Sequence, residues 1–491
     1  MLHIEAKIHD RFTLEFKVGY SHDGDRLPVS DFLMNTWVFV PDALYINPKT
    51  YPKSEFYRDV RSQVRLMTPV YGLHELVEAD APPFVRLEET CARVVDEEEG
   101  EALAADLEHQ LKMLACVVRS ALRSRVRALE LERDAERCLS LLEETLSDLE
   151  QVERRMRGPF EGADRGRMPE GVLGAASVAD RYVGAMALYY LSRLSERLYG
   201  RFATCRGRIE ALLGAYFDRA AARRAALGQP FPAPGAGADA AGAWLDEVAA
   251  LRREVEHDLY LEARKRNNTF VARQVAFMVA AGLSMVFATL VSFSFQQTYG
   301  NFTLPLFVAL VVSYMMKDRI KDLLRYWFAN RLGSRFYDYR TKLDMRGRYI
   351  GLGKEGFDYV SPERLPDDVR ALRRAVAGAA GTDAGAPRPE TVLLYRRRML
   401  LLGRRLADGG SMVYPGVNEI LRFGLGGLLR RVDGPHGRVA AYAGRGRFRM
   451  VAAERMYRLI VVVQFRHQGR VCYKRYRVAL GRRGLHAVDE V

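Results

Sequence analysis

A run of 21 uncharged residues, Val275–Phe295, is the feature that most limits how this chain can fold. A helix of that length rises about 31 Å, and the hydrocarbon core of a bilayer is about 30 Å thick. A second uncharged stretch follows and has 18 residues when counted from Tyr299 to Met316. We therefore predict a two-span transmembrane helical hairpin; the alternative is an apolar hairpin buried in a soluble core. The predicted parts are transmembrane helix 1 at 275–295, an external turn at 296–303 and the core of transmembrane helix 2 at 304–316.

Positive charge flanks both predicted spans. Residues 260–274 carry four Lys or Arg and residues 317–331 carry five, whereas residues 296–303 carry none. Because Lys and Arg concentrate on the cytoplasmic side of membrane proteins, we predict that both termini are cytoplasmic. The abundance of Arg, Ala and Gly indicates a GC-rich bacterial genome, and the first residues contain no apolar signal region. We therefore expect an integral protein of a bacterial inner membrane, with no cleaved secretory peptide.

Small residues recur every four positions along the two predicted spans. They are Ala276, Ala280, Ser284, Ala288 and Ser292 on the first, and Ala309 and Ser313 on the second. Small residues at this spacing let helix backbones approach closely. The stripe predicts packing either within the hairpin or between protomers of a homo-oligomer. Neither span contains an ionisable residue, which favours anchoring over pumping.

A basic amphipathic segment, 317–350, follows the second span. On a helix, its apolar face would comprise Ile320, Leu323, Leu324, Trp327 and Phe328. Such a helix either lies on the membrane surface or continues the second span as an arm that packs on the helix before the first span. No Gly or Pro lies between Leu306 and Asn330, so we favour continuation.

Outside the spans, the patterns predict an α+β membrane protein. Long cytoplasmic helices would form a bundle or coiled-coil arms, and small β-containing domains would lie at both termini. An alternating pattern around His9–Arg11 predicts a β-hairpin, Trp37–Pro41 a further strand, and a change of phase at Lys474–Arg475 a β-bulge. We also hypothesise that the N- and C-terminal β units pack together.

The remaining predicted boundaries are an N-terminal α+β domain at 1–95, a long-helix region at 96–227, a low-complexity linker at 228–242, a membrane-proximal helix at 243–274, a linker region at 351–390 and a basic β-containing domain at 391–491.

The net charge of +14 comes from the last of these domains. Residues 391–491 hold 21 Lys or Arg and 6 Asp or Glu, a net charge of +15, so the first 390 residues sum to −1. The candidate residues for an anionic partner are Arg396, Arg397, Arg398, Arg445, Arg447, Arg449, Lys474, Arg475, Arg477, Arg482 and Arg483. Such a surface attracts anionic lipid head groups, an acidic protein or nucleic acid. We favour lipid and place nucleic acid last.

No motif in the sequence indicates catalysis. The five cysteines and nine histidines have no zinc spacing, and the glycine-rich stretches Gly351–Gly356 and Arg422–Leu429 do not complete a phosphate-binding loop. We therefore predict no catalytic residue, metal or cofactor. The leading hypothesis is a membrane-anchored, cytoplasm-facing scaffold or signalling protein that binds an unknown protein partner. The alternatives are an oligomeric channel or transporter built from the hairpin, and an unrecognised enzyme in the C-terminal domain.

Overall fold

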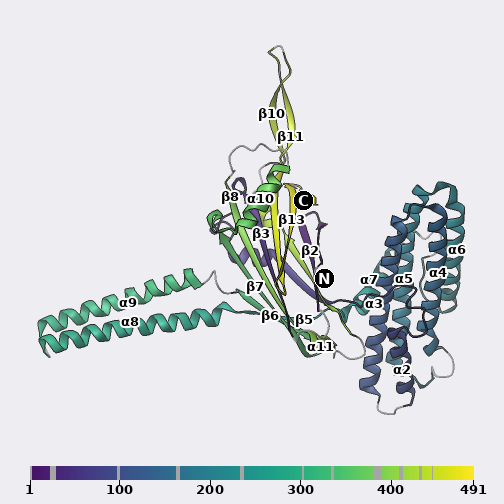
Figure 1. Ribbon diagram of the computed structural model, residues 1–491, viewed down its shortest axis with the longest axis horizontal. Coiled ribbons are helices and arrows are strands. Elements are labelled where there is room, and N and C mark those ends of the chain that lie inside the picture. The colour runs from purple at the N-terminus through teal and green to yellow at the C-terminus, as the bar shows by residue number, and fades with distance from the viewer. Residues whose placement is uncertain are drawn as a thin grey trace. The chain divides into compact units, whose positions relative to one another are not determined.

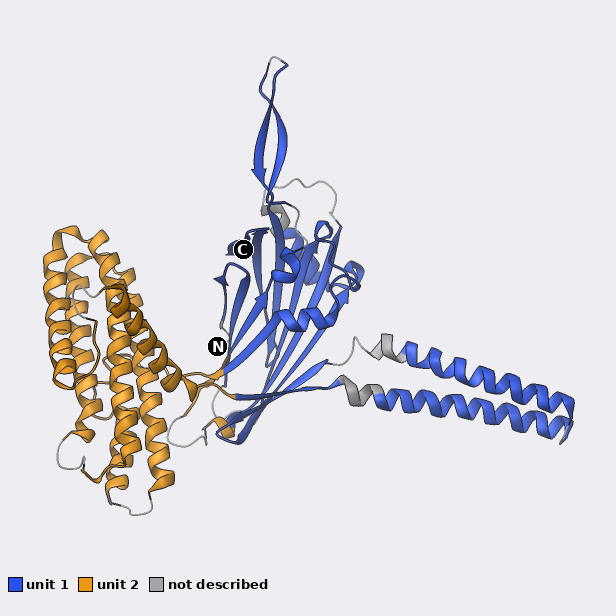
Figure 2. Cartoon of the chain, turned by 180° about the vertical axis from the view of Figure 1, so that it is seen from behind, with its two compact units in different colours: residues 1–64, 262–403, 419–491 blue, residues 65–261, 404–418 orange. Residues whose placement is uncertain are grey.

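The computed structural model of the chain contains two compact units (Figure 1). The sheet unit comprises residues 1–64, 262–403 and 419–491, and the helical unit comprises residues 65–261 and 404–418 (Figure 2). The residues that the structure describes are 3–22, 29–96, 100–161, 166–232, 237–300, 303–332, 337–379, 389–407, 413–430, 434–444 and 446–491.

The sheet unit is organised around an eight-stranded antiparallel sheet that both ends of the chain build together. In sheet order its strands are β14 (Gly484–Glu490), β13 (Arg470–Gly481), β12 (Tyr457–His467), β3 (Val29–Pro41), β8 (Glu390–Leu402), β7 (Arg348–Val360), β6 (Tyr339–Met345) and β5 (Glu262–Asn267). The N-terminal strand β3 pairs with β12 on one side and β8 on the other. The hypothesis that the terminal β units pack together is therefore confirmed. The predicted small terminal domains are wrong, because their strands belong to shared, larger sheets.

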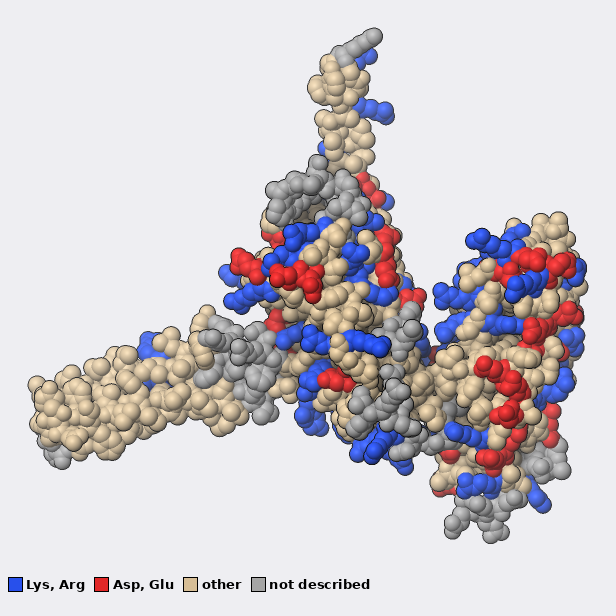
Figure 3. All heavy atoms as spheres, viewed as in Figure 1, with Lys and Arg blue, Asp and Glu red and all other residues tan. Residues whose placement is uncertain are grey.

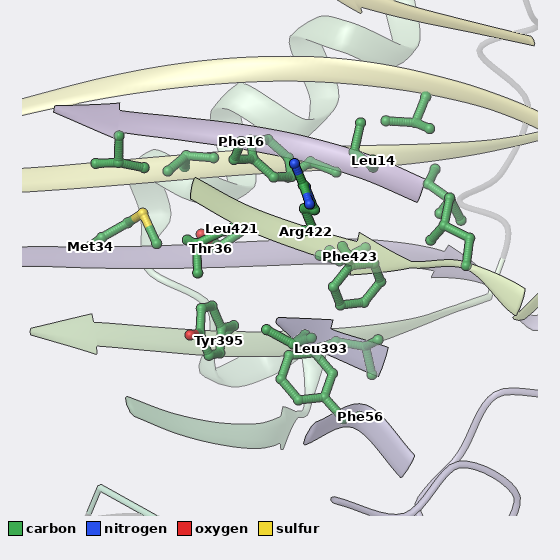
Figure 4. A pocket seen from close by; sticks show the side chains of 18 of the residues that line it. Leu14, Phe16, Met34, Thr36, Phe56, Leu393, Tyr395, Leu421, Arg422 and Phe423 are labelled. Atoms are coloured by element: carbon green, nitrogen blue, oxygen red, sulfur yellow. The ribbon is translucent and has the colours of Figure 1, made fainter. Parts of the chain in front are cut away.

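A second, four-stranded sheet has the order β1 (His3–Asp10), β2 (Thr13–Ser21), β9 (Gly416–Gly424) and β4 (Val60–Leu66). β1 and β2 form the predicted hairpin, with Ile8 opposite Leu14. Apolar side chains from both sheets, among them Leu14, Val18, Met34 and Val461, line a common core with a cavity of about 50 Å³ (Figure 4). The core of this unit therefore lies between the two sheets.

The other face of the eight-stranded sheet is covered at one end by α10 (Asp367–Ala379). Val369 packs there with Trp37 and Val462, and Tyr473 adjoins the cluster. This explains the change of phase in the sequence of β13: its apolar residues meet α10 on one face and the inter-sheet core on the other. The predicted bulge at Lys474–Arg475 is wrong, since β12 and β13 pair in one continuous register.

The remaining short elements of this unit connect its strands. They are η2 (Asp42–Leu44), α1 (Lys53–Asp59), η6 (Pro362–Arg364), α12 (Gly426–Leu429) and the exposed hairpin of β10 (His436–Tyr442) and β11 (Phe448–Glu454). Helix α11 (Gly403–Ala407) follows β8, and all but its first residue belong to the helical unit. The predicted linker 351–390 contains much of β7, η6 and α10, so it is largely structured where it is described.

The helical unit is a bundle and not a set of coiled-coil arms. Its helices are α2 (Pro82–Asp96), α3 (Glu101–Leu131), α4 (Ala135–Arg157), α5 (Glu170–Arg201), α6 (Arg206–Ala226) and α7 (Ala238–His257), with η3 (Gly158–Phe160) and η5 (Ala203–Cys205) between them. Helix α3 contacts α2, α4, α5 and α7, and every residue from Met113 to Val118 is buried. A two-stranded coiled coil buries a single seam, whereas the middle of this helix is buried on all sides.

The predicted membrane-proximal helices 243–274 and 317–350 are each interrupted. Strand β5 lies between α7 and the next helix, α8 (Thr269–Tyr299), and strands β6 and β7 follow the end of α9 (Leu304–Leu332). β5 has no apolar periodicity and all of its residues are exposed, so its pairing with β6 decides its conformation. Helix α9 itself continues unbroken past Met316, as favoured from the sequence.

The prediction of two transmembrane spans is wrong. By length and composition, one helix of the described chain, α8, could cross a membrane, over Gln274–Tyr299. Helix α9 could not, because its uncharged part, Leu304–Met316, rises only about 20 Å. The 18 uncharged residues predicted as the second span were counted from Tyr299. In the structure Tyr299 is the last residue of α8, and Gly300, with φ of +75°, breaks the helix.

Candidate anion-binding site

Five of the eleven basic residues predicted to contact an anionic partner already have carboxylate partners within the sheet unit. Arg398 makes a two-point contact with Asp31, at 2.6 and 2.9 Å, and Arg396 binds Asp358 at 2.7 Å. The carboxylates come from strands β3 and β7, far from these arginines in sequence. The charge of residues 391–491 is therefore partly neutralised by the rest of the sheet.

Arg397 is fully buried between two glutamates. Its guanidinium lies 3.4 Å from Glu355 and also pairs with Glu419, and both carboxylates are buried. Burial alone would lower the pKa of Arg397, but the two glutamates raise it above its usual value. Tyr20 and Tyr395 donate hydrogen bonds to Glu419 and Glu355, at 2.9 and 3.0 Å. The cluster joins strands of both sheets, and Arg397 is not accessible to a partner.

The remaining predicted cations lie on β13, directly after it, and around β11. Lys474 and Arg477 bind Glu490 and Asp489, at 2.7 and 3.1 Å. Arg447 lies in the turn before β11 and Arg449 lies in β11. The other positions are Arg475, whose backbone carbonyl accepts a hydrogen bond from Val491, the exposed Arg482 and Arg483 after β13, and Arg445, which lies outside the described residues.

The small residues of the predicted stripe lie where α8 packs along α9. The residues Ala276, Ala280, Ser284, Ala309 and Ser313 are buried, and Ala288 and Ser292 are half-buried. The Ser313 hydroxyl donates a hydrogen bond to the Ala288 carbonyl, 3.3 Å away. Packing within one chain uses these residues; a homo-oligomer stays a prediction.

The predicted apolar face of the basic arm lies on the second half of α9. Ile320 and Leu324 are half-buried, whereas Leu323 and Trp327 are exposed. The side chain of Phe328 lies outside the described residues. Arg325 stacks over Phe277 of α8 at 5.4 Å, so the arm packs along α8.

A further group of cations lies at the β5–β6 edge of the eight-stranded sheet. Arg264 is directly opposite Lys342, and Arg266 is directly opposite Arg340. These four residues line a cleft of about 330 Å³, together with Tyr349 and Leu352. Figure 3 shows Lys and Arg side chains gathered over this sheet. Because side chains two apart on a strand share a face, the strand pairing brings all four cations together.

The charges of this cleft are only partly neutralised. Glu262 lies 3.3 Å from Arg264, and Asp344 lies 2.9 Å from Lys342. Among the described residues, neither Arg266 nor Arg340 has a carboxylate partner. Like charges directly opposite on neighbouring strands repel each other, so the cleft favours an anion. Sequence reasoning missed it because both segments were assigned to helices; the alternation of cations at 264 and 266, and at 340 and 342, was the available signal.

A histidine in the helical unit forms a buried polar link. The Nδ1 of His109 donates to Asp258 at 2.9 Å, and its Nε2 lies 2.9 Å from the hydroxyl of the buried Tyr414. The contact with His109 is the main reason that the pKa of Asp258 is lowered. Because both ring nitrogens of His109 have partners within the unit, we assign this link a structural role.

The contact between His109 and Asp258 predicts that the helical unit becomes less stable at low pH. Because the folded-state pKa of Asp258 is below its ordinary value of 3.8, its contribution is present above that pH and is lost as pH falls through the folded value. Thermal melts followed by helical circular dichroism at pH 5 and pH 3 should show a smaller difference for Asp258→Asn than for the native chain. Equal differences would contradict this assignment.

A second group of potential ligands lies in the helical unit. Ligand atoms of His74, Glu144 and Asp148 lie within 4.8 Å of one another. However, Glu144 binds Arg125 at 2.6 Å and Asp148 contacts His74 at 3.3 Å. His74 and Glu144 therefore have partners, whereas the second carboxylate oxygen of Asp148, Oδ2, is buried without a hydrogen-bond partner among the described residues.

Comparisons of this chain with protein-family models, with curated proteins and with solved structures find no match.

Proposed function

We propose that this protein is a membrane-attached binding protein whose α8–α9 hairpin inserts its tip into one face of a bilayer. The observation that carries the proposal is the apolar surface of α8. Only 17% of the apolar span in α8 is buried, unlike the core helix of a soluble domain. Met278, Leu290 and Phe293 are each about two-thirds exposed. Exposed apolar surface of this extent marks a lipid or protein contact.

The register of the hairpin limits how deeply it would insert. Ser313 contacts Ala288 and Arg325 contacts Phe277, so Lys317, the first charge on α9, lies alongside Ser284. Beyond that level both helices are uncharged for about 20 Å, which is less than the roughly 30 Å hydrocarbon core. Figure 3 shows this end of the hairpin without charged atoms. The tip would therefore enter the bilayer without crossing it.

The sheet requires both ends of the hairpin to lie on the same side of that bilayer. β5 ends just before α8, β6 begins after α9, and the two strands pair with each other. The cations beside the hairpin favour the cytoplasmic side of a bacterial inner membrane. The bundle and the sheets would then be available to partners there. The alternative of a channel or transporter required two membrane spans. Because α9 is too short in its uncharged part to be a span, we do not propose a channel.

Alkaline carbonate extraction and topology labelling test this function. The full chain, expressed in bacteria, should stay in the membrane pellet at high pH, and release into the supernatant would overturn the proposal. A cysteine in place of Thr298, near the tip, should not react with an impermeant maleimide added on the periplasmic side. Labelling there would show that the hairpin crosses, contrary to the proposed depth.

A further inference from the structure

We propose that the cleft between β5 and β6 binds a small organic phosphate. Its four cations are Arg264, Arg266, Arg340 and Lys342. Two of them have carboxylates nearby, whereas Arg266 and Arg340 have none among the described residues. A bound phosphate group would accept hydrogen bonds from both arginines and relieve the repulsion between them.

The size and lining of the cleft define the class of ligand. A volume of about 330 Å³ lies at the lower end of the range for small-molecule sites. Four cations exceed what one phosphate needs, so the cleft suits a ligand with two phosphate groups. Tyr349 and Leu352 supply a wall of lower polarity for an organic part of the ligand.

A phosphate group could come from a soluble metabolite or from a lipid head group. Helix α8 rises about 22 Å between Thr269, which follows β5, and Ser284, where the uncharged part of the hairpin begins. This separation favours the soluble source. Only this choice of source rests on the proposed membrane attachment; the cleft and its charges do not.

The test uses the double substitution Arg266→Gln and Arg340→Gln in the full chain, with Arg449→Gln as a control at an exposed cation outside the cleft. Calorimetry should show that the native chain binds pyrophosphate and a nucleoside diphosphate. Each arginine removed should weaken binding about tenfold or more, so the double variant should bind at least about a hundredfold more weakly. The control should bind as the native chain does. Affinity should also fall as salt concentration rises.

A second arm separates the two sources and checks folding. If a lipid supplies the phosphate, vesicles with phosphatidylglycerol should bind the native chain more tightly than neutral vesicles, and the double variant should lose that difference. If the source is soluble, the vesicle difference should be the same in both proteins. The melting temperature of the double variant should not fall, since the two arginines repel each other. The proposal is overturned if the native chain binds neither pyrophosphate nor phosphatidylglycerol vesicles selectively, or if the double variant binds as the native chain does.

Discussion

Replacing Arg397 with methionine should destabilise the sheet unit by about 3–5 kcal/mol. The substitution leaves Glu355 and Glu419 buried with their shared partner removed, and those carboxylates are 2% and 0% exposed. Urea denaturation in mild detergent, combined with hydrogen exchange of the β8 and β9 amides, measures the loss. The same change at Arg398 is the control, because its partner Asp31 is exposed and such a pair contributes about 0–1 kcal/mol.

Neutralising the two carboxylates should restore part of that stability, although Glu355 keeps its ion pair with Lys265. Adding Glu355→Gln and Glu419→Gln to Arg397→Met removes the buried negative charges that Arg397 compensated while keeping the volume of the side chains. If Arg397→Met proved no more harmful than Arg398→Met, the buried ion cluster would not have the structural role assigned to it.

Charged residues near the tip of α8 should abolish attachment to lipid. Leu290 and Phe293 are 64% and 65% exposed and lie on the part of α8 that faces only uncharged residues of α9. An aspartate in hydrocarbon costs about 2.5–3.5 kcal/mol, so Leu290→Asp with Phe293→Asp should reduce binding to neutral vesicles by at least about a hundredfold. Flotation through a density gradient measures this directly.

The matched control for attachment is Leu245→Asp in the helical unit. Leu245 is 70% exposed, so the substitution adds one of the two negative charges of the tip variant at an equally accessible apolar position outside the hairpin. It should leave flotation unchanged. Equal flotation of the native and tip-substituted chains would mean that the apolar surface of α8 serves a contact other than lipid.

Local patterns predicted the local structure well. The alternation on either side of Asp10 predicted the β1–β2 hairpin, and the strand predicted at Trp37–Pro41 lies within β3. The long-helix region predicted at 96–227 contains the helices α3, α4, α5 and α6. In each case the residues that determine the conformation are neighbours in sequence.

Features that depend on distant partners were not predictable in this way. Arg397 looks like a surface cation because its glutamates lie 42 and 22 residues away, on other strands. β5 looks helical because nothing within Glu262–Asn267 indicates pairing with a strand more than 70 residues further on. The anion-binding cleft exists only through that pairing, so neither segment alone reveals it.

Because β5 pairs with β6, the α8–α9 hairpin is an insertion between two neighbouring strands of the sheet. Asn267 and Tyr339 are register partners in adjacent antiparallel strands, and the whole of α8 and α9 lies between them in sequence. A two-residue turn can join such strands. The pairing of β5 with β6 therefore does not depend on the apolar helices. We expect a shortened chain, with a tight turn in place of α8 and α9, to keep the register of these strands and to lose the exposed apolar surface of α8. The same fold is thus compatible with a lipid-bound form and a water-soluble form that differ by one continuous excision.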